Sequence, residues 1–135
     1  MIQDLEGLLR SGFAKEGACV VIPYYNEHKD AEETKAFIES MGGTCVLMAG
    51  DIKDTAFCDK IVDETIKKFG RIDVLVNNAG VQYQQKNLLD ITDEQFDNTM
   101  KTNIYSIFYL TKRALKCMSP RFKYNKCIVY NNVLW

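Results

Sequence analysis

The sequence contains a single histidine and no long apolar run, and these two absences exclude several classes of protein. His28 alone supports neither an H-E-x-x-H zinc site nor a Ser-His-Asp triad, and no G-x-x-x-x-G-K nucleotide loop is present. No apolar stretch approaches the roughly 20 residues that a membrane-spanning helix requires. We therefore expect neither a metal site nor a membrane partner.

Cysteine pairs and export signals are missing too. The five cysteines form no C-x-x-C pair, and Cys19 and Cys45 lie inside apolar runs, as small buried residues do. Asp4 and Glu6 stand where a secretory signal would carry lysine or arginine. The sequence therefore predicts buried thiols and a cytoplasmic protein.

The net charge of −1 hides an uneven distribution, because no acidic residue follows Asp97 while lysines and arginines do. Most of these cations fall in the last turns of a helix predicted to end before Pro120, where they complement the negative end of the helix dipole. No module of interleaved aromatic and basic residues accompanies them, so we expect no nucleic-acid partner.

Four short apolar runs recur along the chain and are predicted to be strands. They cover residues 18–22, 45–48, 72–76 and 127–130. Continuous rather than alternating apolarity is typical of strands that are covered by helices on both faces. Because helical patterns separate these runs, the sequence predicts an α/β fold with a parallel sheet and right-handed crossovers, in one domain over residues 1–135.

The helical patterns between the strands have recognisable ends. One begins at Asp54 and stops at Gly70, and another is predicted over residues 2–13. The longest opens with the capping box of Thr92 and Gln95. Its buried face is predicted to carry the apolar residues Phe96, Met100, Ile104, Ile107, Phe108, Leu115 and Met118.

Residues 69–80 read F-G-R-I-D-V-L-V-N-N-A-G, which resembles the most specific fingerprint of the short-chain dehydrogenase/reductase family. This resemblance implies a Rossmann-type doubly wound sheet, NAD or NADP as cofactor, and oxidoreduction of an alcohol or carbonyl group of a sugar, polyol or similar small molecule. In the family, the turn that matches Asn77, Ala79 and Gly80 runs beside the adenosine and ribose of the cofactor. An ordinary strand-to-loop turn would use the same residue types.

The resemblance extends to other polar positions. It implies that Asp51 and Ile52 hold the adenine, although Asp51 could also cap the next helix. Asn26 follows the second strand of the family pattern, where the choice between NAD and NADP is made. Asn103 matches an asparagine of the family's catalytic proton relay, and a hydrogen-bonded core asparagine is the alternative. Residues 13–18 and 25–34 are most similar to the bacterial general-stress and glucose/ribitol dehydrogenase subgroup.

Two parts of the family pattern have no match. No strand with a T-G-x-x-x-G-x-G loop precedes Phe13, and neither a serine nor a Y-x-x-x-K pair follows residues 127–133. The Y-x-x-x-K spacing of Tyr25 and Lys29 lies at the wrong strand and is interpreted as a coincidence. These gaps predict a partial Rossmann domain, lacking the first strand and the last βα units and truncated at both ends, that is catalytically incomplete.

The missing first strand has a further consequence in this interpretation. By analogy with the family it lies at the centre of the sheet, so we expect a split core, with strands two and three paired on one side and strands four and five on the other. Exposed strand edges or the helix over residues 92–118 could then pair with partners. The alternative to an incomplete enzyme is therefore a non-enzymatic interaction module, which could associate into a homo-oligomer.

Overall fold

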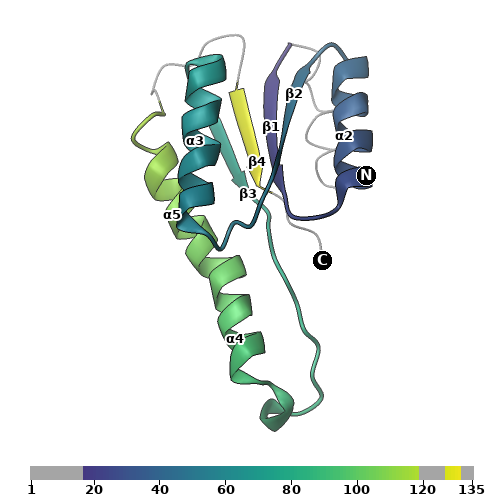
Figure 1. The fold of residues 1–135 in the computed structure, drawn as a ribbon, viewed down its shortest axis with the longest axis vertical. Helices are drawn as coiled ribbons and strands as arrows, with labels where there is room; N and C mark the ends of the chain where they lie inside the picture. The colour runs from purple at the N-terminus through teal and green to yellow at the C-terminus, as the bar shows by residue number, and fades with distance from the viewer. Residues whose placement is uncertain (1–16, 119–126, 132–135) are drawn as a thin grey trace.

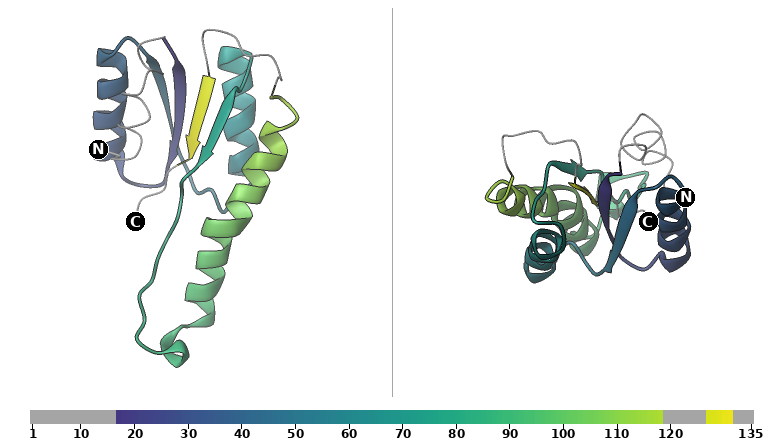
Figure 2. Two further views of the ribbon diagram at one scale, coloured as in Figure 1. Left: turned by 180° about the vertical axis from the view of Figure 1, so that it is seen from behind. Right: turned by 90° about the horizontal axis from the view of Figure 1, so that it is seen from above.

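The computed structural model describes residues 17–118 and 127–131, and the helix predicted over residues 2–13 lies outside them. Four parallel strands form one sheet, with α2 on one face and α3 and α5 on the other (Figures 1 and 2). No helix within the described ranges is long and apolar enough to cross a membrane. The elements are β1 (Cys19–Tyr24), α2 (His28–Ser40), β2 (Thr44–Ala49), α3 (Thr55–Phe69), β3 (Val74–Asn77), the 3-10 turn η3 (Leu88–Asp90), α4 (Asp93–Met100), the π-helical turn η4 (Lys101–Tyr105), α5 (Ser106–Ala114) and β4 (Cys127–Asn131).

The predicted α/β class is confirmed, because all four predicted strands form and pair in parallel. Alternate residues of each strand enter opposite core layers. Val21 and Val129 pack with Leu110 in the layer under α3 and α5. Ile22 and Tyr130 belong to the layer that includes side chains of α2. Burial on both faces accounts for the continuous apolarity of these strands.

The predicted strand pairs are confirmed, β1 with β2 and β3 with β4, but the predicted split between these two pairs is wrong. The strand order is β2-β1-β4-β3, so β4 lies between β1 and β3 although it comes last in the chain. Cys127 aligns with Cys19 on one side, and Asn131 aligns with Asn77 on the other. The physical reason is that unpaired backbone groups in a sheet centre are costly, and an apolar strand that fills the gap satisfies both edges. The predicted right-handed crossovers hold for the first two connections but not for the third, from β3 to β4.

The ends of α3 form as predicted. The Asp54 side chain accepts a hydrogen bond from the Ala56 N–H at 2.9 Å and caps the first turn. Gly70 ends the helix with a φ of +74°, a left-handed conformation that favours glycine. Both signals are local, which is why the sequence alone could place them.

The long predicted helix differs from its prediction in shape and orientation. The capping box of Thr92 and Gln95 is confirmed, but the helix passes through a π-helical turn and ends at Ala114 rather than near Met118. Phe108 is 59% exposed, and Phe96, Ile104 and Leu115 are exposed as well. The buried side instead carries Thr102, Ser106, Leu110 and Ala114. Small side chains on this face let α5 pack closely against α3.

Burial controls the acidity of three cysteines. It raises the pKa of the Cys45 and Cys127 thiols to about 12 and that of the Cys58 thiol to about 11. All three are free thiols, which agrees with the predicted buried cysteines. Cys117 is exposed.

These raised pKa values predict how stability depends on pH. Below the ordinary thiol pKa of 9.0 the Cys45 thiol is neutral in both the folded and the unfolded state, so its contribution to the free energy of unfolding is fully present. As the pH rises from 9 toward 12, the unfolded chain ionises first and the free energy of unfolding falls. We expect the urea midpoint to drop between pH 8 and pH 10.5, and to drop less in the Cys45→Ala variant. An equal drop in both chains would contradict this assignment.

Candidate functional site at the carboxyl ends of the strands

The candidate site lies at the edge of the sheet where the parallel strands end. Asn26 follows β1, Asp51 and Ile52 follow β2, and Asn77 is the last residue of β3. Open α/β sheets bind ligands at this carboxyl edge. The topology therefore brings the residues predicted to bind cofactor from three strands to one end of the molecule.

The Asn-Asn-Ala-Gly turn after β3 is tied to the sheet and to α5. The Asn77 side-chain amide donates to Thr111 Oγ1 at 3.2 Å, and the Asn78 N–H donates to the Asn131 carbonyl at 2.8 Å. Ala79 is buried, whereas Gly80 is exposed. A Cβ atom on Gly80 would lie 3.7 Å from Asn103 Oδ1, an ordinary contact. Gly80 therefore leaves its backbone accessible from solvent, although the neighbouring side chains would also leave room for a Cβ atom at this position.

Asn103 holds the segment that follows this turn. Its side-chain oxygen accepts from the Val81 N–H at 2.7 Å, and its side-chain nitrogen donates to the Val81 carbonyl at 2.9 Å. The residue lies in the π-helical turn η4, a deviation that often occurs at functional sites. The hydrogen-bond partners of this half-buried amide are thus the N–H and C=O groups of one residue, Val81, which lies 22 residues earlier in the chain.

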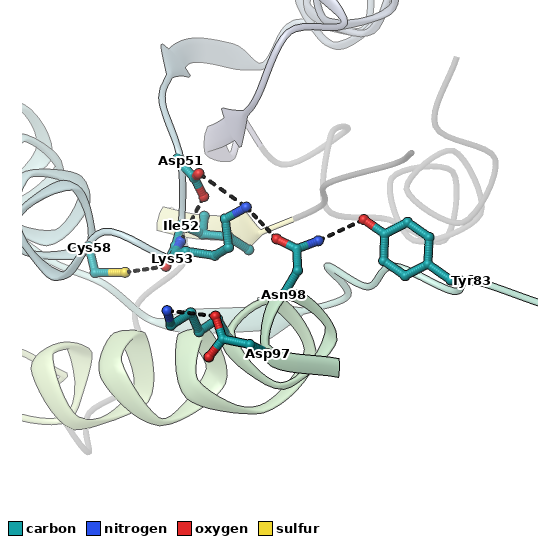
Figure 3. Close-up of polar contacts among 8 residues, drawn as sticks. Asp51, Ile52, Lys53, Cys58, Tyr83, Asp97 and Asn98 are labelled. Atoms are coloured by element: carbon teal, nitrogen blue, oxygen red, sulfur yellow. Dashed lines mark hydrogen bonds and ion pairs between the residues drawn. The ribbon is translucent and has the colours of Figure 1, made fainter. Parts of the chain in front are cut away.

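Asp51 begins a chain of polar contacts that reaches across to α4 (Figure 3). Its carboxylate accepts from the Lys53 N–H at 2.9 Å and lies 3.4 Å from Lys53 Nζ. Lys53 Nζ donates to Asn98 Oδ1 at 2.6 Å, and Asn98 Nδ2 donates to the Tyr83 hydroxyl at 2.7 Å. Sequence reasoning missed Lys53, Asn98 and Tyr83, because their contacts join segments far apart in the chain.

A hollow of about 700 Å³ opens beside this chain of contacts, within the usual size range of small-molecule sites. It lies between the segment after β2 and α4, and carboxylates and amides outnumber the lysines on its wall. Its lining residues are Tyr25, Asp51, Lys53, Asp54, Tyr83, Glu94, Gln95, Asp97, Asn98 and Lys101. The hollow offers hydrogen-bond acceptors and donors at the edge where the predicted residues gather.

Ile52 and Asn26 occupy contrasting surroundings. Ile52 is 1% exposed, and its carbonyl accepts a hydrogen bond from the Cys58 thiol at 3.2 Å. Its side chain therefore belongs to the core, and its role beside an adenine stays a prediction. Asn26 is exposed, and its amide group faces the carboxylate of Glu27.

Several buried polar atoms in β3, β4 and η4 have no hydrogen-bond partner within the described residues. They are Asn77 Oδ1, Thr102 Oγ1 and both polar atoms of the Asn131 side chain. An unsatisfied buried group costs about 1–3 kcal/mol, so this concentration favours a bound polar group or water at the carboxyl edge. Amide groups of this kind suit the hydroxyls of a ribose. Within the same described ranges, no three His, Cys, Asp or Glu side chains gather as metal ligands do.

The clamp of Asn103 on Val81 predicts a specific loss of stability. In the Asn103→Ala variant the Val81 N–H and C=O lose their partners, and we expect unfolding to become easier by about 1–3 kcal/mol. Amide hydrogen exchange at Val81 should become faster. Asn87→Ala is the matched control, because the Asn87 side chain caps only the exposed turn η3. Similar effects from both variants would show that the clamp does not hold this segment.

Comparisons with known proteins cover most of the chain. The family model described as enoyl-(acyl carrier protein) reductase matches residues 11–130. General stress protein 39 of Bacillus subtilis is 50% identical over 108 residues, which make up 80% of this chain and 38% of that protein. The chain therefore spans about two fifths of the length of this curated relative.

Solved structures give the same picture. An NADH-dependent reductase named A1-R′, crystallised with NAD, is 32% identical with a TM-score of 0.69, over 77% of this chain and 43% of that one. A short-chain dehydrogenase from Burkholderia cenocepacia J2315 in complex with NADP is 27% identical with a TM-score of 0.75, over 84% of this chain and 46% of that one. The described fold thus corresponds to somewhat less than half of each of these proteins.

Proposed function

Because the chain belongs to the short-chain dehydrogenase/reductase family, we propose that its described residues form the adenosine-facing part of an NAD(P) site. The observation that supports this most is the placement of Asn26, Asp51 and Asn77 at the carboxyl ends of three strands, next to a hollow that Asp51 lines. Relatives of known structure bind NAD or NADP in the same fold.

Each residue would contribute one kind of contact. The Asp51 carboxylate would accept a hydrogen bond from the adenine amino group, with Ile52 packed beneath it. The amides of Asn26 and Asn77 would bind ribose hydroxyls, and the open backbone at Ala79 and Gly80 would let the ligand approach the main chain. Asn103 would position this loop through Val81. A part in proton relay stays a prediction for Asn103.

For the whole protein we propose oxidoreduction of an alcohol or carbonyl group of a small molecule such as a sugar or polyol. The nicotinamide, when bound, supplies the hydride chemistry. The hydroxyl proton needs an acid or base within hydrogen-bond reach, and these 135 residues contain no serine or Y-x-x-x-K pair after β4. We therefore propose that the present residues bind and position, in a cytoplasmic setting, without transferring the proton themselves.

The surroundings of Asn26 favour NAD over NADP. The Asn26 N–H donates to Glu27 Oε2 at 3.3 Å, which keeps a carboxylate where the adenosine ribose would bind. Lys29, a candidate partner for a phosphate on the ribose, faces Glu33 at 3.9 Å instead. A carboxylate accepts hydrogen bonds from ribose hydroxyls and repels a 2′-phosphate, so we propose a preference for NAD.

This proposal predicts how the melting temperature responds to dinucleotides. A ligand that binds only the folded state stabilises it by about 2.7 kcal/mol at a hundredfold excess over its Kd. We expect NAD to raise the melting temperature of the full chain by several degrees and NADP to raise it less. The Asp51→Asn variant should reduce both shifts, and Glu27→Gln should narrow the difference between them.

Glu39→Gln is the matched control for Glu27→Gln, because it makes the same change of charge at an exposed position near the other end of α2. It should leave both shifts unchanged. The absence of a shift with either dinucleotide would refute the proposed site. Equal shifts with NAD and NADP would refute only the proposed preference.

A second candidate function, association of two copies, is favoured by the outer face of η4 and α5. Ile104, Phe108 and Leu115 lie along one side of this segment and are 53–65% exposed. Their spacing of four and seven residues places them in one stripe, opposite the side that packs on α3. An apolar stripe of this length on a helix is typical of a homo-oligomer contact, and we propose that a second copy covers it.

The stripe predicts an effect of charge on molecular mass. Phe108→Glu should halve the molecular mass measured by light scattering, because it places a carboxylate in a buried apolar contact. Leu89→Glu introduces the same charge at a residue that is 88% exposed but lies in η3, outside the stripe, and should leave the mass unchanged. A monomeric parent chain would refute this contact.

A further inference from the structure

The connection from β3 to β4 differs in hand from the other two connections of the sheet. All strands are parallel, so the hand of each crossover depends on the direction of its step across the sheet and on the face that carries its helix. The steps from β1 to β2 and from β3 to β4 both run toward the β2 edge. Their helices lie on opposite faces, α2 on one and α5 on the other (Figure 2). The two crossovers therefore have opposite hands.

The remaining crossover identifies the exception. The step from β2 to β3 runs the other way, with α3 on the same face as α5, so it shares the hand of the β1-to-β2 crossover. These two are right-handed, as about 98% of parallel crossovers are. The β3-to-β4 crossover is left-handed. A right-twisted strand followed by a helix does not readily return to the sheet in that sense.

The position of β4 is nevertheless strongly specified. Its residues are at most 2% exposed and enter both core layers. At one end the Cys127 N–H donates to the Asp73 carboxylate at 2.8 Å, and the Asp73 N–H donates to the Cys127 carbonyl at 2.9 Å. At the other end the Asn131 carbonyl accepts from the Asn78 N–H at 2.8 Å. These contacts at both ends fix the register in which β4 fills the slot between β1 and β3.

We propose that the slot between β1 and β3 is filled by β4 of a second copy of the chain, in a strand-exchanged homodimer. A donated strand of identical sequence makes every contact just described. It also removes the left-handed crossover, because the strand then no longer has to return to its own sheet. The partner copy would supply Asn131, and with it the unsatisfied amide, to the carboxyl edge of each site.

The register pair of Cys19 and Cys127 offers a direct test. Neighbouring parallel strands lie about 4.8 Å apart, within the roughly 4.4–6.8 Å between Cα atoms that a disulfide spans. The chain is used at full length with the exposed Cys117 replaced, as Cys117→Ser. Unlabelled and ¹⁵N-labelled chains are mixed in equal amounts, unfolded, refolded together under mild oxidation and digested. Mass spectrometry then identifies the peptides joined through these two cysteines.

Strand exchange predicts a mass no smaller than that of a dimer, and cross-linked peptides of which about half join a labelled to an unlabelled chain, as random pairing requires. Mixing after refolding should give no mixed pairs, since exchange needs unfolding. The Phe108→Glu variant should keep its mixed pairs, because the helix stripe plays no part in them. Only unmixed pairs, a monomeric mass, or no link between Cys19 and Cys127 would each overturn the proposal.

Discussion

The open backbone edges of β1 and β3 are the constraint on which the rest of the structure depends. Neither edge can face the core without a partner, because buried N–H and C=O groups must be hydrogen-bonded. β4 satisfies both edges and supplies side chains to the two core layers at once. Without a strand in this position, no backbone hydrogen bonds would join the pair β1 and β2 to β3 in one sheet. The carboxyl edge, and any site on it, exists because this strand is present.

Local physical chemistry made much of the fold predictable from the sequence. The apolar runs that form β1 to β4 are long enough to be recognised, and the caps at Asp54, Gly70 and Thr92 act within a few residues. Strand order was not predictable in this way, because β4 pairs with β1, which lies more than 100 residues away in the chain. The exposed face of α5 was misjudged for a related reason. Its packing depends on the small residues Ser106 and Ala114 rather than on the largest apolar ones.

The candidate site was likewise predictable only where a local motif identifies a residue. Asp51, Asn77 and Asn103 could be named because each stands at a recognisable point in a motif. Their partners could not, since the contacts of Lys53 with Asn98 and of Asn103 with Val81 span 45 and 22 residues. The comparisons with relatives show the family over most of the chain, while the contacts of individual side chains come only from the fold.

The π-helical turn at residues 101–105 stores one residue more than an α-helix of the same length would hold. If the same residues formed a regular α-helix instead, the extra residue would turn α4 by about 100° relative to α5. Asn98 would then swing away from Lys53, and the clamp on Val81 would lose its alignment. The extra residue acts as a phase shift between two halves of one helix. It lets α5 keep its small residues against α3 while α4 presents amides to the hollow.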